Sequence, residues 1–269
     1  INNLKTFFAI KGGFFGKTTG YVKAVNNVTF DVYPGETLGL VGESGCGKTT
    51  IGRTIIQLEQ ASEGEILYLG KDVTKMNAKE LRAFRKEVQI IFQDPYSSLN
   101  PRMTIGNAIM EPMQVHGILK NNDERKKRVE ELLTRVNLDP SHFYRYPHEF
   151  SGGQRQRIGI ARALAVNPKF IICDESVSAL DVSVQAQVLN LLNELKKDYG
   201  LTYIFISHDL SVVKYMSDRM VVMQSGIIEE MGDADDIYRN PKTEYTKKLI
   251  DAIPEGRMED IKKTSTIKN

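Results

Sequence analysis

The amino-acid sequence predicts an α/β protein in which helices cover a largely parallel sheet. The sequence contains short apolar runs in which polar residues do not alternate with apolar ones. This composition is typical of strands that are buried on both faces. These runs are residues 37–41, 88–92, 170–173 and 203–206. Between the last two runs, apolar side chains recur at helical spacing at Val184, Val188 and Leu191. Apolar runs that alternate with helical segments therefore favour a sheet with helices on its faces.

Length and composition limit the kind of protein. The 269 residues predict one large domain or two smaller ones, at about 150 residues per domain. Lys and Arg number 36 against 34 Asp and Glu, a net charge of +2 that is too balanced to indicate nucleic acid or a membrane. No apolar stretch reaches the roughly 20 residues of a transmembrane helix, and residues 1–5 lack a secretory layout. Cys46 and Cys173 have no metal-ligand spacing, so we expect a soluble cytoplasmic protein.

The remaining elements follow from shorter patterns. Apolar spacing within residues 129–136 predicts a helix, with Asn122 or Asp123 as its N-cap. After Pro241 the chain becomes polar and basic, and we expect a frayed end. Further strands are predicted at residues 22–33, 65–69, 220–223 and 227–228, the last two as a hairpin.

Residues 42–49 match the phosphate-binding pattern G-x-x-x-x-G-K-[ST]. A strand leads in, and a helix with Ile51, Ile55 and Leu58 on one face leads out, so a chance match is the weaker interpretation. Glycines let successive N–H groups turn inward and form an anion nest at a helix start. The residues expected to contact a nucleotide triphosphate are Gly42, Glu43, Ser44, Gly45, Cys46, Gly47, Lys48, Thr49 and Thr50.

Three residues of this segment have specific expected roles. Lys48 should reach the β and γ phosphates, and the Thr49 hydroxyl should be a ligand of Mg²⁺. Cys46 stands near a helix N-terminus, where we expect an activated thiolate.

Polar residues follow three of the apolar strands. Asp174 and Glu175 end a buried strand; the first is expected to hold Mg²⁺ together with Thr49, and the second to activate a water molecule. Gln93 and His208 follow two other strands. Ligands of open α/β sheets bind at the carboxyl edge of the strands, which favours a site over incidental loop residues.

A second glycine-rich segment, Ser151-Gly152-Gly153-Gln154, opens a predicted helix. A helix N-terminus with small residues can bind an anion. Since one nucleotide needs only one cradle, a second cradle indicates that another subunit's nucleotide is bound there. The alternative is a flexible turn before a helix.

Together these motifs resemble those of the ATP-binding subunits of ABC transporters, from near the start of the chain to about residue 240. Phe150 stands where the signature motif of the family usually has Leu. The motifs, in family order, are Walker A (42–49), Gln93, the signature (151–154), Walker B (170–174), Glu175, residues 178–181 and His208.

The resemblance implies a fold and a domain organisation. The expected fold is a RecA-like P-loop NTPase core with an N-terminal antiparallel β subdomain and an inserted α-helical subdomain. The ATPase domain would span residues 1–237, with the insertion at about 94–158, and residues 238–269 would form a short C-terminal extension.

The chain resembles most the oligopeptide/dipeptide importer branch, which includes nickel-uptake relatives, through residues 41–48, 92–102 and 146–157. That branch usually carries His-Pro-Tyr-Thr near the C-terminus, where this chain has Thr243-Glu244-Tyr245-Thr246. No cysteine follows Cys173, which excludes the iron–sulfur cluster of some relatives. The implied function is ATP hydrolysis that powers import of oligopeptides or dipeptides, with nickel or another small solute as the alternative.

Residue roles come from the same resemblance. Glu175 would be the general base, and His208 would contact the γ-phosphate. Gln93 would bind Mg²⁺ and relay its presence to the membrane subunits. Tyr21, or else Phe15, would stack on adenine.

The implied assembly contains two ATPase chains that sandwich two ATP molecules head to tail. Asp181 would contact the opposite chain, which is expected to be a different protein, and residues 96–102 would face two transmembrane permease subunits. An extracytoplasmic substrate-binding protein completes the expected system, which includes no nucleic acid. Its ATPase subunits would lie at the cytoplasmic face of the membrane.

Two other classes of protein fit the sequence less well. A non-transport ABC ATPase of DNA repair would need a very long insertion between Lys48 and Ser151, and translation types usually fuse two cassettes. A P-loop kinase or GTPase has no use for the signature. The basic residues 125–128 are expected to form a solvated helix face.

Overall fold

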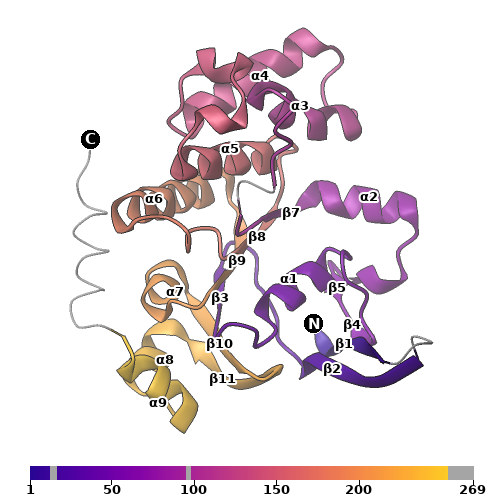
Figure 1. Ribbon diagram of the computed structural model, residues 1–269, viewed down its shortest axis with the longest axis vertical. Coiled ribbons are helices and arrows are strands. Elements are labelled where there is room, and N and C mark those ends of the chain that lie inside the picture. Colours follow the sequence, from indigo (N-terminus) through magenta and orange to yellow (C-terminus); the bar gives the residue numbers. More distant parts are fainter. Residues whose placement is uncertain (13–16, 95–97, 254–269) are drawn as a thin grey trace. The chain divides into compact units, whose positions relative to one another are not determined.

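The computed structural model describes residues 1–12, 17–94 and 98–253 (Figure 1). These residues divide into two compact units. The first unit contains Ile1–Leu81 together with the described chain from Ile204 onward, and the second contains Arg82–Tyr203.

The first unit contains strands from both ends of the sequence. Its elements up to the division are β1 (Asn2–Gly12), β2 (Lys17–Val28), β3 (Thr37–Val41), α1 (Lys48–Ile55), β4 (Glu63–Glu65), β5 (Leu67–Tyr68), β6 (Lys71–Asp72), the 3₁₀ helix η1 (Val73–Lys75) and the start of α2 (Ala78–Glu87). Its later elements are the end of β9 (Thr202–Ser207), α7 (Leu210–Met216), β10 (Arg219–Gln224), β11 (Ile227–Asp233), α8 (Ala234–Arg239) and α9 (Glu244–Asp251).

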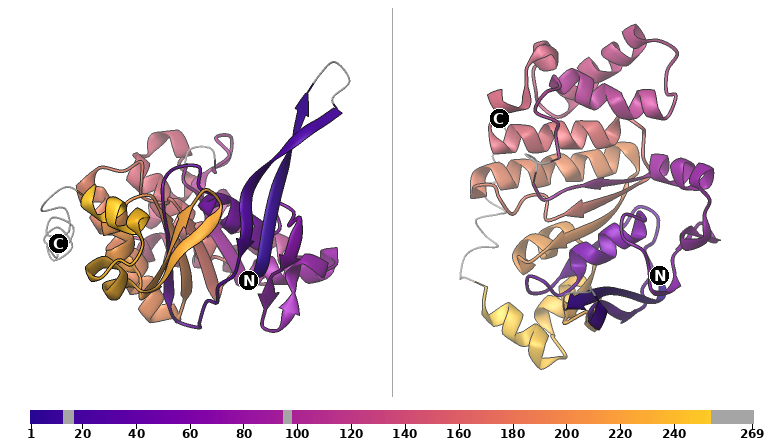
Figure 2. Two further views of the ribbon diagram at one scale, coloured as in Figure 1. Left: turned by 90° about the horizontal axis from the view of Figure 1, so that it is seen from below. Right: turned by 45° about the vertical axis from the view of Figure 1, so that its right-hand side comes forward.

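Two sheets organise this unit. Strands β2, β1 and β4 form an antiparallel sheet in the order β2-β1-β4, and β1 with β2 extends as a long ribbon (Figure 2, left). In the other sheet the order is β11-β10-β3-β9, with β10 parallel to β3 and antiparallel to β11. Every residue of β3 is buried, which confirms the strand predicted from its apolar composition.

The predicted hairpin at residues 220–228 is present as β10 and β11. Ser225 (φ 48°) and Gly226 (φ 83°) both have left-handed backbone, as a two-residue hairpin turn requires. Two strand predictions were wrong in extent. β2 ends at Val28 instead of residue 33, and residues 65–69 are divided between β4 and β5.

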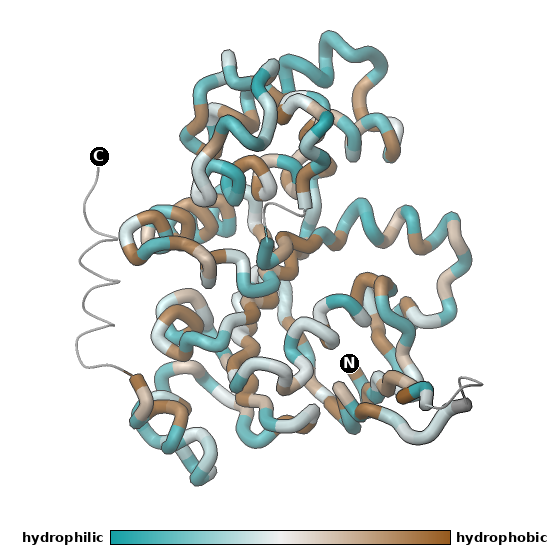
Figure 3. Tube along the Cα trace, in the orientation of Figure 1, coloured by the Kyte–Doolittle hydropathy of each residue, from teal (hydrophilic) through white to brown (hydrophobic). Residues whose placement is uncertain are grey.

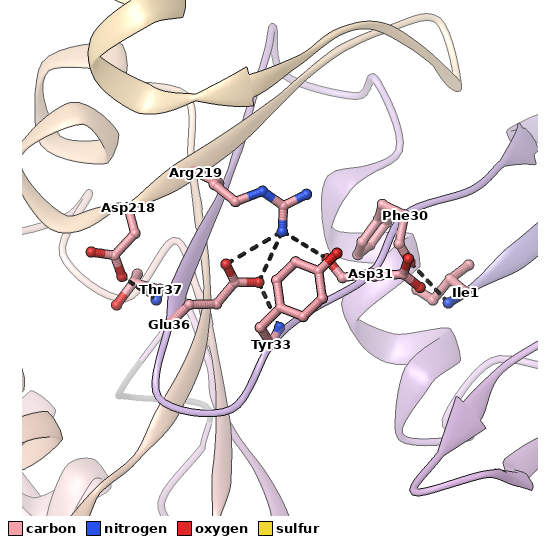
Figure 4. A network of polar contacts seen from close by, with 8 residues as sticks. All are labelled: Ile1, Phe30, Asp31, Tyr33, Glu36, Thr37, Asp218 and Arg219. Carbon is pink, nitrogen blue, oxygen red and sulfur yellow. Dashed lines mark hydrogen bonds and ion pairs between the residues drawn. The ribbon is translucent and has the colours of Figure 1, made fainter.

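A polar network fixes the loop that precedes β3 (Figure 4). The Arg219 guanidinium, at the start of β10, donates to both Glu36 carboxylate oxygens at 3.2 and 3.3 Å and to the Asp31 carbonyl oxygen at 3.3 Å. It also lies 4.9 Å from the centre of the Tyr33 ring. The Tyr33 N–H donates to Glu36 at 2.6 Å. One arginine therefore holds a loop far from it in sequence.

The second unit is mainly helical. After most of α2 come β7 (Val88–Ile91), α3 (Ile105–Val115), α4 (Asn122–Arg135), the 3₁₀ helices η2 (Pro140–Tyr144) and η3 (Pro147–Glu149), α5 (Gly152–Leu164), β8 (Phe170–Asp174), α6 (Val182–Tyr199) and the start of β9. Helices α3, α4 and α5 pack on one another, and α5 also contacts α6 and β7.

Hydrophobic residues follow the strands, and they alternate with hydrophilic residues along the helices (Figure 3). β7 pairs in parallel with β8, with Val88 opposite Phe170. The predicted helix near residues 129–136 is α4, but its N-cap is Asn121, whose side chain accepts the Glu124 N–H at 2.9 Å.

The segment after Pro241 is more ordered than its polar composition predicts. Residues 244–251 form α9, and Thr243 caps it by accepting the Thr246 N–H at 3.1 Å. The basic end that we expect to fray lies outside the described residues. Within the described parts of the chain, none of the helices has the length and apolar character needed to span a bilayer.

Candidate functional site

The phosphate loop predicted at residues 42–49 runs from buried β3 into α1, as its pattern requires. Gly42, Gly45 and Gly47 have φ values of 153°, 80° and 105°, conformations that side chains with a Cβ rarely adopt. Helix α1 is shorter than predicted, since it ends at Ile55 and leaves Leu58 outside it and 53% exposed.

Two of these glycines are also required by close backbone contacts. A Cβ on Gly42 would lie 2.1 Å from the Met223 carbonyl oxygen, and a Cβ on Gly47 would lie 2.1 Å from the Ala24 carbonyl oxygen. A Cβ on Gly45 would meet no atom within 4 Å. The backbones of β2 and β10 therefore confine the loop at two points and leave its middle open, an arrangement that fits a phosphate cradle.

Lys48 is buried beneath the loop, with 3% of its surface exposed. Its ammonium donates to the carbonyl oxygens of Gly42 (2.7 Å) and Glu43 (2.8 Å), and to the Cys46 sulfur at 3.7 Å. A buried positive charge at the N-terminal end of α1 adds to the field of the helix dipole. The loop thus has both the shape and the charge to hold an anion.

The prediction of an activated Cys46 thiolate was wrong. Burial raises the pKa of this thiol, and the nearby Lys48 charge and hydrogen bonds, which lower it, do not offset burial. The side chain is buried, and a desolvated thiolate is costly even next to a cation.

The β10–β11 turn is a part of the loop's surroundings that sequence reasoning missed. The Gly226 N–H donates to the Cys46 carbonyl oxygen at 3.0 Å, and the Gly226 carbonyl oxygen accepts the Asn26 N–H at 2.8 Å. This turn therefore connects the phosphate loop to β2. The Ser225-Gly226 pair indicated a hairpin, but a turn pattern does not specify what it contacts.

In the second unit, Asp174 and Glu175 end β8 and Gln93 follows β7. Asp174 is buried, with 2% of its surface exposed, and Glu175 has a left-handed φ of 47°. The Gln93 side-chain amide donates to the Glu175 carboxylate at 3.0 Å. Because β7 and β8 are parallel neighbours, their carboxyl ends bring these two side chains together as predicted.

The Ser151–Gln154 segment opens α5 with a capping box. The Ser151 hydroxyl accepts the Gln154 N–H at 3.3 Å, and the Gln154 side chain accepts the Ser151 N–H at 3.0 Å. A Cβ on Gly153 would lie 2.2 Å from the Val184 side chain, so glycine permits close packing on α6. Ser151 and Gly152 remain exposed, which leaves the start of α5 open to an anion.

The other predicted site residues differ in their surroundings. Asp181 is the N-cap of α6 and accepts the Val184 N–H at 3.0 Å, so it has a structural role within this chain whatever else it contacts. His208 is exposed after β9. Tyr21 is 62% exposed on β2, opposite Ala9. Phe15 and part of the 96–102 segment lie outside the described residues.

The expected Mg²⁺ ligands Thr49, Gln93 and Asp174 provide hydroxyl, amide and carboxylate oxygens, the donors that this hard cation prefers. Among the described residues, no cluster of three or more His, Cys, Asp or Glu side chains could hold a metal by itself. Thr49 belongs to the first unit, whereas Gln93 and Asp174 belong to the second.

The α/β fold and the glycine-built loop define a P-loop nucleotide-binding protein. Residues 25–178 match the profile of the ABC transporter family. The chain is 59% identical over 87% of its length to the oligopeptide transport ATP-binding protein OppF of Bacillus subtilis, covering 77% of that protein. The chain belongs to the ABC transporter family and is an ABC-type ATPase, which confirms the family and fold class expected from its motifs.

Further comparisons agree. The chain is 53% identical over 96% of its length to the oligopeptide transport ATP-binding protein AppF of Bacillus subtilis, covering 78% of it. It is 51% identical over 94% of its length to the glutathione import ATP-binding protein GsiA of Pectobacterium atrosepticum, of which it spans only 41%. A dimeric ATP-binding cassette solved in a post-hydrolysis state with ADP and Pi superposes with a TM-score of 0.76, at 27% identity over 87% of this chain and 97% of that one.

Proposed function

We propose that this chain is the ATP-hydrolysing subunit of an importer for oligopeptides or dipeptides. The observation that carries the proposal is the 59% identity to an oligopeptide transport ATP-binding protein over 87% of the chain. The similarity to a glutathione import ATP-binding protein supports the same substrate class, because glutathione is itself a short peptide.

In this proposal the loop from Gly42 to Thr49 holds the ATP phosphates. The confined backbone of the loop and the buried Lys48 ammonium support this role. Thr49, Asp174 and Gln93 would hold Mg²⁺, which when bound neutralises charge on the β and γ phosphates. Tyr21 would stack on the adenine, an interaction for which its exposed ring is suited.

Glu175 is proposed as the general base that takes a proton from the attacking water. Its hydrogen bond with Gln93 orients the carboxylate, and an oriented carboxylate can accept a proton along a fixed direction. His208, exposed after β9, would contact the γ-phosphate.

The proposed assembly pairs this chain with a second ATPase chain. The N-terminus of α5 supports a role in binding the nucleotide of that chain, because Ser151 and Gly152 are exposed there and the positive end of the helix dipole favours an anion. Two permease subunits and an extracytoplasmic substrate-binding protein would complete the importer, and the ATPase would be held at the cytoplasmic face of the membrane.

The test uses the assembled transporter, purified through this chain so that its membrane partners are identified. Glu175→Gln should lower ATP hydrolysis by about 10²–10⁴-fold and leave ATP binding intact, while Lys48→Ala should weaken both. Glu194→Gln, an exposed position on α6, is the matched control and should behave as the unaltered chain. Unchanged turnover in the Glu175 variant would contradict the proposed base.

Substrate class is tested in the same preparation after reconstitution into vesicles. ATP-dependent uptake of a labelled oligopeptide or dipeptide is expected. Uptake of Ni²⁺ with no peptide uptake would refute the peptide proposal and favour the nickel alternative.

A further inference from the structure

The altered Thr243–Thr246 segment is firmly attached to the sheet of the first unit. Glu230, on β11 and 8% exposed, accepts the N–H groups of Lys242 (3.0 Å) and Thr243 (3.2 Å) just before α9. Thr246 is fully buried, and its hydroxyl lies 2.8 Å from that of Thr243. Helix α9 packs on β11 (Figure 1). The first turn of α9 is therefore held by side-chain and backbone hydrogen bonds together.

This anchoring directs the next side chain at the phosphate loop. The Tyr245 hydroxyl accepts the Glu43 N–H at 3.2 Å. Burial raises the pKa of Tyr245, so the hydroxyl is neutral over the ordinary pH range and keeps its own proton to donate. Loop and helix also share the wall of a cavity of about 570 Å³, lined by Glu43, Gln224, Glu229, Thr243, Glu244, Tyr245, Lys248, Leu249 and Ala252.

The hydrogen bond between the Glu43 N–H and Tyr245 constrains a whole peptide group, because the Glu43 N–H and the Gly42 carbonyl belong to the same peptide. That carbonyl oxygen accepts from the Lys48 ammonium at 2.7 Å. A peptide group is planar, so fixing its N–H on one side and its C=O on the other fixes its orientation. Tyr245 and Lys48 thus hold the same peptide from opposite sides.

We propose that Tyr245 is a positioning residue for the phosphate loop, which it orients through the Gly42–Glu43 peptide and, through that peptide, the Lys48 ammonium. The proposal rests on the proposed function, since the loop is taken to bind ATP. It gives helix α9 a role in nucleotide affinity through a contact with the backbone of the loop.

The test compares Tyr245→Phe with the unaltered full-length chain. This change removes one hydroxyl and keeps the aromatic ring of residue 245, which belongs to α9 and lines the cavity. Loss of one hydrogen bond that orients the loop should weaken binding of a fluorescent ATP analogue by about three- to tenfold. In the assembled transporter, KM for ATP should rise by a similar factor while kcat changes little, a split that a general loss of stability would not produce. Tyr238→Phe on α8 is the matched control, because Tyr238 is not among the residues that line the cavity.

The outcomes separate the two proposals. Binding by the unaltered chain, with equal affinity in Tyr245→Phe, would overturn the positioning role alone. Failure of the unaltered chain to bind the analogue would overturn both the positioning role and the proposed function. Equal weakening of nucleotide binding in Tyr245→Phe and Tyr238→Phe would overturn the positioning role, because the effect would then not depend on the contact with Glu43.

Discussion

Replacing Gly47 by alanine would place a Cβ 2.1 Å from the Ala24 carbonyl oxygen, in a backbone with a φ of 105°. Ordinary carbon–oxygen contacts are about 3.3 Å or longer, so one of the two chains must move by about 1 Å. The Ala24 oxygen belongs to the backbone and the new Cβ is fixed to the backbone of residue 47. A change of side-chain rotamer therefore cannot relieve the contact. The matched variant is Gly45→Ala, whose added Cβ meets nothing within 4 Å at a φ of 80°.

The expected losses of stability differ because only one site is crowded. A left-handed backbone at a residue other than glycine costs about 1–2 kcal/mol, and this is the whole expected cost for Gly45→Ala. At Gly47 the displacement also disrupts the Gly226 N–H to Cys46 and Asn26 N–H to Gly226 hydrogen bonds, each worth about 1 kcal/mol. The expected total for Gly47→Ala is therefore about 3–4 kcal/mol.

The assay is thermal and urea unfolding followed by far-ultraviolet circular dichroism, because the chain has no tryptophan. At about 2–4 °C per kcal/mol for chains of this size, Gly47→Ala should lower the unfolding midpoint by about 10 °C and Gly45→Ala by about 4 °C. Equal shifts in the two variants would refute the reasoning, because the backbone conformation alone would then explain both.

Two further predictions concern ion pairs and buried charges. Arg219→Lys should lower the free energy of unfolding by about 1–2 kcal/mol in a urea titration, since it replaces the planar, weakly hydrated guanidinium that lies over the Tyr33 ring with a compact, strongly hydrated ammonium. A loss equal to that of the exposed Arg239→Lys would contradict this. Burial raises the pKa of Glu230, but hydrogen bonds from Lys242, Thr246 and Thr243 outweigh it, so the pKa lies below its ordinary value. Its stabilising contribution is therefore present above the unfolded-state pKa and is lost as the pH falls through the folded-state value. Midpoints of unfolding for Glu230→Gln and the unaltered chain should differ at pH 7 and converge below about pH 4; a constant difference across this range would rule the effect out.

Local patterns predicted the features that depend on local chemistry. The phosphate loop requires particular residues at adjacent positions, and so does the capped start of α5, whose Ser151 and Gln154 form the expected helix terminus. Asp181 shows the limit of assigning roles by resemblance, because an Asp before a helix also caps it, as it does here.

Long-range contacts could not be predicted from local patterns. Gly42 and Gly47 are confined by backbone atoms of β10 and β2. Which strands lie next to the loop depends on how the whole sheet is arranged, and no single segment of sequence encodes that arrangement. The Tyr245 hydroxyl meets Glu43 across 202 positions of sequence. The resemblance to the importer branch identified the segment around Tyr245 as altered, but only the folded chain shows the partner of Tyr245.

The turn at Gly226 and the helix that carries Tyr245 also have a consequence for synthesis. The ribosome produces Gly42–Thr49 roughly two hundred residues before it adds the backbone that completes the surroundings of this loop. Such long loops must close before these contacts form. A nascent chain that ends before Gly226 therefore carries the phosphate-loop sequence without the turn that holds it, so the cradle is completed only after that turn has been synthesised.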